Sequence, residues 1–65
     1  MRAGETELEM EVRHVAEQEE RIARQEVLIE RLRRAGVPTN DAVGLLRDMH
    51  SLLETMRAHV KRLSN

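Results

Sequence analysis

The sequence predicts an all-α fold: an antiparallel hairpin of two long helices that dimerises into a four-helix bundle. Apolar residues recur three and four positions apart over two long segments, which is typical of amphipathic helices. Only the segment from Gly36 to Thr39 has the glycine and proline that separate two helices. The chain has 65 residues and no cysteine, and so small a core rarely suffices without a disulfide, metal or partner subunit. We therefore expect one self-associating domain over residues 1–65.

The first helix is expected over residues 7–35. Thr6 and Glu9 have the spacing of a capping box, in which each side chain accepts from the other residue's backbone N–H. At the far end, Gly36 suits the left-handed position that follows a helix, and Pro38 prevents the helix from continuing.

The second helix is expected over residues 40–63, after a turn at 36–39 in which Thr39 is the best N-cap. Its apolar residues alternate four and three apart, which is a heptad seam. The seam consists of Ala42, Leu46, Met49, Leu53, Met56, Val60 and Leu63. Leu45 and Leu52 lie beside this seam and broaden it, which implies a second neighbouring helix.

The first helix has two apolar lines. The stronger line consists of Leu8, Val15, Ile22 and Ile29 at sevenfold spacing, joined near the turn by Leu28 and Leu32. The weaker line, about 100° around the helix, consists of Val12, Ala16, Ala23 and Val27. Small side chains in the weaker line would let another helix approach closely, so we treat it as a second interface.

Two glutamines, Gln18 and Gln25, lie seven residues apart and face the expected interface. Polar residues in such a seam can fix the register or the number of helices. Partial exposure to solvent is an equal alternative.

Charge also favours the antiparallel arrangement. Residues 5–20 are rich in glutamate, and the end of the second helix carries Arg57, Lys61 and Arg62. Folding back at the turn brings these opposite charges side by side, and each complements its own helix dipole. Helical spacing predicts further ion pairs within the first helix, namely Glu9/Arg13, Glu17/Arg21, Glu20/Arg24 and Glu30/Arg34.

Composition argues against several classes of protein. No apolar run reaches the ~18 residues of a membrane span, and no secretory signal is evident, so we expect a cytoplasmic protein without a membrane partner. No serine lies in a nucleophile motif and the glycines form no phosphate loop. We therefore expect no enzyme activity, no cofactor and no small-molecule substrate.

Three histidines, His14, His50 and His59, invite a metal hypothesis. If residues pair about the turn, His14 comes near His59, and Glu17 would complete the outline of a site. Their spacing matches no established zinc motif, so histidines at the rim of charged helices are the simpler interpretation, and we expect no metal.

A basic cluster ends the first helix and consists of Arg24, Arg31, Arg33 and Arg34. These cations complement the negative end of the helix dipole. The alternative is a small nucleic-acid-binding regulator that uses them to contact phosphates. The chain lacks the aromatic residues and the positive charge typical of such proteins, since its net charge is −1.

Several segments resemble a group of small uncharacterised bacterial proteins that form helical hairpins. They are residues 13–17, 21–25 and 29–32, together with Gly36, Thr39, Leu45 and Leu46. The resemblance covers about two thirds of the chain and carries over no activity. The sequence as a whole predicts a non-enzymatic interaction or structural module. Its expected partner is a second copy of the chain, in a homodimer or a larger assembly, with an unidentified protein as a further option.

Overall fold

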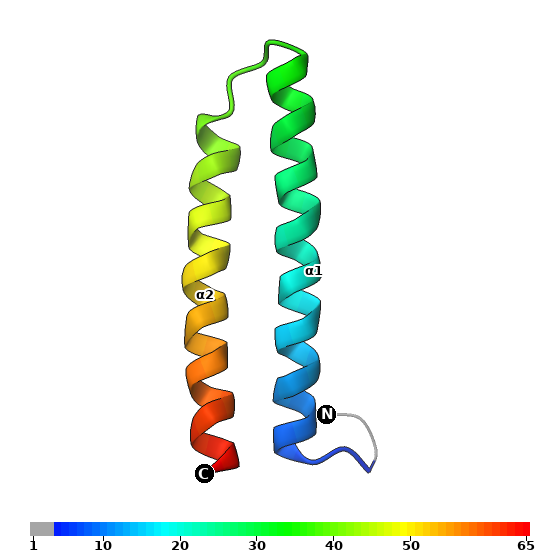
Figure 1. Cartoon of the computed structure of the whole chain (residues 1–65), viewed down its shortest axis with the longest axis vertical. Coiled ribbons are helices and arrows are strands. Elements are labelled where there is room, and N and C mark those ends of the chain that lie inside the picture. The colour runs from blue at the N-terminus through cyan, green and yellow to red at the C-terminus, as the bar shows by residue number, and fades with distance from the viewer. Residues whose placement is uncertain (1–3) are drawn as a thin grey trace.

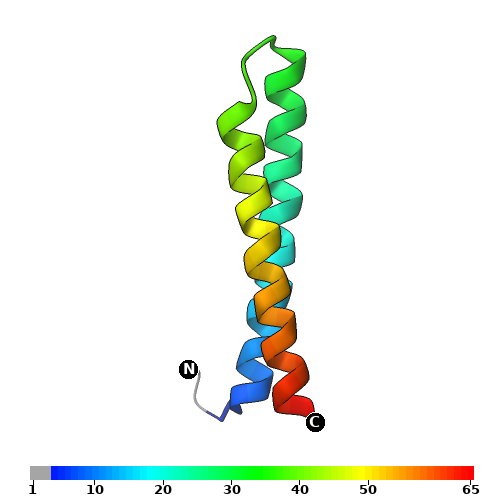
Figure 2. The same ribbon diagram turned by 90° about the vertical axis from the view of Figure 1, so that its left-hand side faces the viewer.

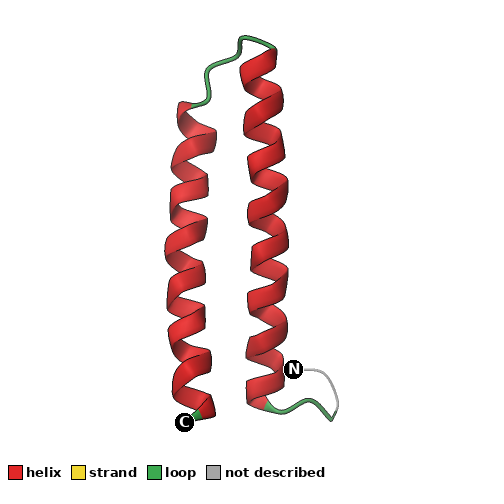
Figure 3. Cartoon of the chain, viewed as in Figure 1, coloured by secondary structure: helices red, strands yellow, loops and turns green. Residues whose placement is uncertain are grey.

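The computed structural model describes residues 4–65, which form an antiparallel hairpin of two helices (Figure 1). Helix α1 spans Glu7–Arg34 and α2 spans Asn40–Ser64. Each helix therefore ends within one residue of its predicted C-terminal bound. The described residues contain no strand (Figure 3), so the predicted all-α hairpin is confirmed. Residues 1–3, part of the predicted single domain, lie outside the described residues.

The two helices lie side by side along most of their length, and the end of α1 extends past the start of α2 (Figures 1 and 2). The molecule measures 46 × 21 × 13 Å. Its smallest dimension is close to the diameter of one helix, about 10–12 Å with side chains. Each helix is thus covered on one side only, by the other helix.

The start of α1 has the predicted capping box. The backbone N–H of Glu9 donates to the Thr6 hydroxyl over 3.1 Å, and the Thr6 N–H donates to the Glu9 carboxylate over 3.2 Å. Two backbone donors that the first turn leaves without a helical partner are thereby satisfied. The prediction for this end of the helix is confirmed.

The end of α1 is a Schellman motif. Gly36 has φ +71°, in the left-handed region that favours glycine. The N–H of Val37 donates to the carbonyl of Leu32 over 2.9 Å, and the N–H of Gly36 donates to that of Arg33 over 3.1 Å. These two bonds define the motif, and they confirm the glycine cap.

Thr39 lies at the N-cap position of α2, but its side chain makes no capping hydrogen bond. Its ψ is 3°, whereas Thr6 at the other N-cap has an extended ψ of 164°. The extended conformation is the one that directs a capping hydroxyl at the first turn. The expectation that the Thr39 hydroxyl caps α2 is therefore wrong, and only its carbonyl bonds into the helix, accepting from Val43 over 2.8 Å.

The core between the helices is narrow. Among residues 4–65, four side chains are buried: Ile22, Ile29, Leu53 and the polar Gln18. The rest of the predicted interior is half-buried and comprises Val15, Leu32, Leu46, Met49, Met56, Val60 and Leu63. Leu45 and Leu52 are each 52% exposed, so they do not belong to the core of the hairpin.

Candidate interaction surfaces

Two glutamine side chains cross from α1 to the backbone of α2. Gln18 donates through Nε2 to the carbonyl of Met49 over 3.0 Å, and Gln25 donates to the carbonyl of Ala42 over 2.9 Å. The donors are seven residues apart on one helix, and the acceptors are seven apart on the other. The two bonds therefore repeat the same antiparallel pairing at successive heptads.

These bonds settle how the glutamines face. Gln18 is only 3% exposed, while Gln25 is half-buried. A carbonyl within a helix has a second lone pair beside the one used by its helical N–H, so it can accept the amide. The Gln18 carbonyl in turn accepts from Arg21 over 3.4 Å, and no buried side-chain polar atom in residues 4–65 lacks a partner.

One side of the hairpin carries exposed leucines. His59 lies 3.8 Å from Glu7, so the heptad positions of these two residues share that side. Steps of seven from Glu7 lead along α1 through His14 and Arg21 to Leu28. Steps of seven back from His59 lead along α2 to Leu52 and Leu45. Leu28 is 44% exposed, and the other two leucines are each 52% exposed. We call Leu28, Leu45 and Leu52 the leucine flank.

On the opposite side of the hairpin, an ion pair joins the two helices. Arg57 on α2 donates to Glu19 on α1 over 2.8 Å, which is the predicted attraction between the acidic start of α1 and the basic end of α2. Glu26, one heptad from Glu19, is exposed. It borders a shallow hollow of about 260 Å³ whose rim also carries Arg33. We call this side the charged flank.

Within α1, two of the four predicted ion pairs form. Glu20 lies 3.9 Å from Arg24, and Glu30 lies 3.3 Å from Arg34. Glu9 does not pair with Arg13, because its carboxylate belongs to the capping box.

Arg13 instead pairs with two other glutamates. It donates to Glu5 over 3.0 Å and to Glu17 over 3.2 Å, and Arg21 donates to Gln18 rather than to Glu17. The hydrogen bond that Arg13 donates to Glu5 is the main cause that raises the pKa of Arg13 above its ordinary value. No spacing rule predicts the Glu5 contact, because Glu5 precedes the helix and helical spacing does not apply to it.

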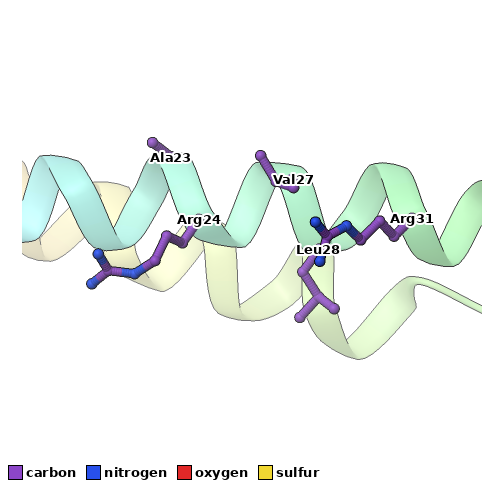
Figure 4. A pocket seen from close by; sticks show the side chains of 5 residues that line it. All are labelled: Ala23, Arg24, Val27, Leu28 and Arg31. Carbon is purple, nitrogen blue, oxygen red and sulfur yellow. The ribbon is translucent and has the colours of Figure 1, made fainter.

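The third surface is the outer face of α1, which we define as Val12, Ala16, Ala23 and Val27. All four are exposed, and the two valines are each 51% exposed. Beside this face runs an open groove of about 420 Å³, lined by Ala23, Arg24, Val27, Leu28 and Arg31. In Figure 4, Ala23 and Val27 point away from α2, whereas Leu28 points to the other side of α1.

The basic cluster at the end of α1 is largely paired. Glu20 lies 3.9 Å from Arg24, and Glu30 lies within 4 Å of both Arg33 and Arg34. Arg31 is the member without an ion pair to any acid of residues 4–65. The cluster therefore presents less uncompensated positive charge than its sequence indicates.

The outlined metal site of His14, Glu17 and His59 does not form. His59 faces Glu7, and Glu17 pairs with Arg13. No group of three histidine, aspartate or glutamate side chains in the described part of the chain could hold a metal ion. His50 is exposed.

Neither helix within residues 4–65 has an apolar stretch that could cross a membrane. No protein-family model, curated protein or solved structure matches the chain. The resemblance to small bacterial hairpin proteins therefore stays a prediction, and the three surfaces are the basis for assigning a role.

Proposed function

We propose that this protein is a non-enzymatic, self-associating helical module whose hairpins pair through the leucine flank into a four-helix bundle. The observation that carries the proposal is the exposure of Leu28, Leu45 and Leu52 on one side of a hairpin with so few buried apolar side chains. Burial of apolar surface is the dominant favourable term in folding and association. A second hairpin would cover this surface.

The half-buried seam adds to the same surface. Met49 lies four residues after Leu45, and Met56 lies four residues after Leu52, so each methionine adjoins a leucine on the helix. Both methionines are half-buried in the single hairpin. A four-helix bundle covers such residues from more than one helix, as a lone pair of helices does not.

The nucleic-acid alternative has less support. Binding to a phosphate backbone depends on cations that replace the counterions of the nucleic acid. Three of the four arginines in the basic cluster lie within 4 Å of a glutamate of the same helix. We therefore favour self-association. A cytoplasmic setting is part of the proposal, and the absence of cysteine supports it.

Light scattering of the purified protein tests the proposal, because one chain has a mass of 7.5 kDa. We expect at least twice that mass. Leu52→Glu should lower the mass toward one chain, since it would place an unpaired charge in the interface. Ser51→Glu is the matched control, because Ser51 is also exposed on α2 and lies outside the leucine flank. A helical monomer at micromolar concentration would refute self-association, and equal effects of the two variants would refute the assigned surface.

A further inference from the structure

The outer face of α1 has the same order of residues from either end. Val12 and Ala16 are four residues apart, as are Ala23 and Val27, and the midpoint falls between residues 19 and 20. A two-fold contact between identical subunits requires that when residue i meets residue j, j also meets i. Two antiparallel copies of α1 centred on this midpoint pair valine with valine and alanine with alanine. We propose that the outer face binds the α1 helix of a second copy in this arrangement.

The face is open to such a helix. Val12 and Val27 are each 51% exposed. Ala23 and Val27 point away from α2 (Figure 4), so a second α1 can approach this half of the face without displacing α2. Val12 lies nearer α2, at a shallow hollow of about 160 Å³ that Arg57 and Val60 also line. The two alanines at the centre allow the helix axes to come within about 8 Å, the lower end of the usual range. The groove of about 420 Å³ beside Ala23 has room for the valine side chain of the second copy.

Charge selects the antiparallel direction. The first turn of α1 carries Glu7 and Glu9, and its last turn carries Arg31, Arg33 and Arg34. Antiparallel pairing about the midpoint places Arg31 level with residue 8 of the second copy, one residue from the exposed Glu9, whereas Glu7 faces His59 on the leucine flank. Arg31 has no ion pair with an acid of residues 4–65, so it is available for this contact. Parallel pairing would instead place like charges together at both ends.

The centre of the contact brings Glu19 and Glu20 of both copies toward the two-fold axis. Arg57 lies 2.8 Å from Glu19, and Arg24 lies 3.9 Å from Glu20, so each carboxylate brings its own cation. These pairs offset the repulsion between the glutamates. The outer face shares no residue with the leucine flank, although Leu28 borders the groove, and so this contact does not depend on the proposed function.

Single-cysteine variants test the arrangement, because the chain has no cysteine of its own. Ala16 of one copy lies level with Ala23 of the other, and at an axis separation of about 8 Å their Cα atoms come within the ~7 Å that a disulfide can bridge. Two copies of Ala16 are about 10 Å apart along the axis, which is too far. Mild oxidation of mixed A16C and A23C proteins should give a covalent dimer, and neither variant alone should give one.

The controls separate the outcomes. A mixture of A16C with S51C, whose cysteine lies on α2 outside both surfaces, measures disulfides formed by random collision. Cross-linking of A16C alone would indicate parallel helices. A yield of A16C–A23C dimer no higher than that of the A16C–S51C control would exclude the contact. Either result overturns the inference. Adding Leu52→Glu to both the A16C and the A23C variant tests whether the outer face acts independently of the leucine flank. The disulfide between A16C and A23C should still form, even if light scattering under reducing conditions shows a lower mass. If the cross-link disappears in these variants while circular dichroism still shows helices, the outer-face contact depends on the leucine flank, and the claim that the two surfaces are independent is wrong.

Discussion

Gln18→Glu changes one side-chain nitrogen to oxygen and should strongly destabilise the hairpin at neutral pH. In the native chain Gln18 is 3% exposed, and its Nε2 donates to the Met49 carbonyl over 3.0 Å. The substitution places a carboxylate oxygen against that carbonyl oxygen. A lost hydrogen bond costs about 1 kcal/mol, and an uncompensated buried charge costs about 3–5 kcal/mol. Arg21, within 3.4 Å of the Gln18 Oε1, offsets part of this, so we expect a net loss of roughly 3 kcal/mol.

Gln25→Glu is the matched control, because Gln25 donates to the Ala42 carbonyl over 2.9 Å but is only half-buried. Water can solvate its carboxylate, so its cost should be nearer 1 kcal/mol. Urea unfolding followed by circular dichroism, at one protein concentration, measures both variants. Equal losses of stability for the two variants would refute the view that burial of Gln18 sets the magnitude.

The pH dependence gives a second check on Gln18→Glu. Burial raises the pKa of the new carboxyl in the folded state above the ordinary value of about 4.3. The folded state therefore holds its proton more tightly than the unfolded state does. Below about pH 4 the protonated acid can donate to Met49, and the penalty is small. The penalty grows as pH rises and levels off above the folded-state pKa. A penalty that stays constant across this range would contradict the reasoning.

Other substitutions test the local features of the fold. Gly36→Ala should lower the free energy of unfolding by about 1 kcal/mol, because φ is +71°. Gly44→Ala should raise the free energy of unfolding by up to about 1 kcal/mol, because Gly44 is helical and an added Cβ meets nothing within 4 Å. Urea unfolding measures both glycine variants, and two shifts of the same sign would contradict these expectations. Thr6→Ala should remove about 1 kcal/mol with the cap, and hydrogen exchange should quicken in the first turn of α1 if the capping box holds that turn. Arg57→Gln should cost less than about 1 kcal/mol, since its pair with Glu19 is half exposed, and high salt should abolish the difference if the effect is electrostatic.

Local patterns predicted the helix ends well, because caps depend on a few neighbouring residues. The capping box at Thr6 and the glycine at Gly36 need only their own spacing and conformational freedom. Thr39 differs, because the path of the whole turn sets its backbone angle, and residue type alone does not specify that angle. The same reason explains why the Glu5–Arg13 pair was not predicted: it joins a residue before the helix to one within it.

Heptad periodicity located the seam but left the glutamines undecided. The position of Gln18 around α1 follows from the sequence, and its facing direction was predicted. Whether its amide reaches a carbonyl of α2 depends on the separation and relative rotation of the two helices. The periodicity of one helix predicts neither the separation nor the relative rotation of the two helices. The hydrogen bonds to Met49 and Ala42 therefore emerge only when both helices are placed.

The unequal flanks of the hairpin supply the reason to place the proposed four-helix bundle on the leucine flank rather than on the charged flank. On the charged flank, the Arg57–Glu19 ion pair crosses between the helices near their middle. An apolar surface that covered this flank would have to desolvate the pair, whereas the contact proposed for the outer face of α1 places glutamates beside it. On the leucine flank, the polar contact between His59 and Glu7 lies at the end of the hairpin. The middle of that flank holds Leu45 and Leu52 of α2 beside His14 and Arg21 of α1. A second hairpin can therefore bury leucines there without breaking an ion pair between the helices, while the long side chain of Arg21 keeps its charge in solvent, which is why we assign the interface to this side.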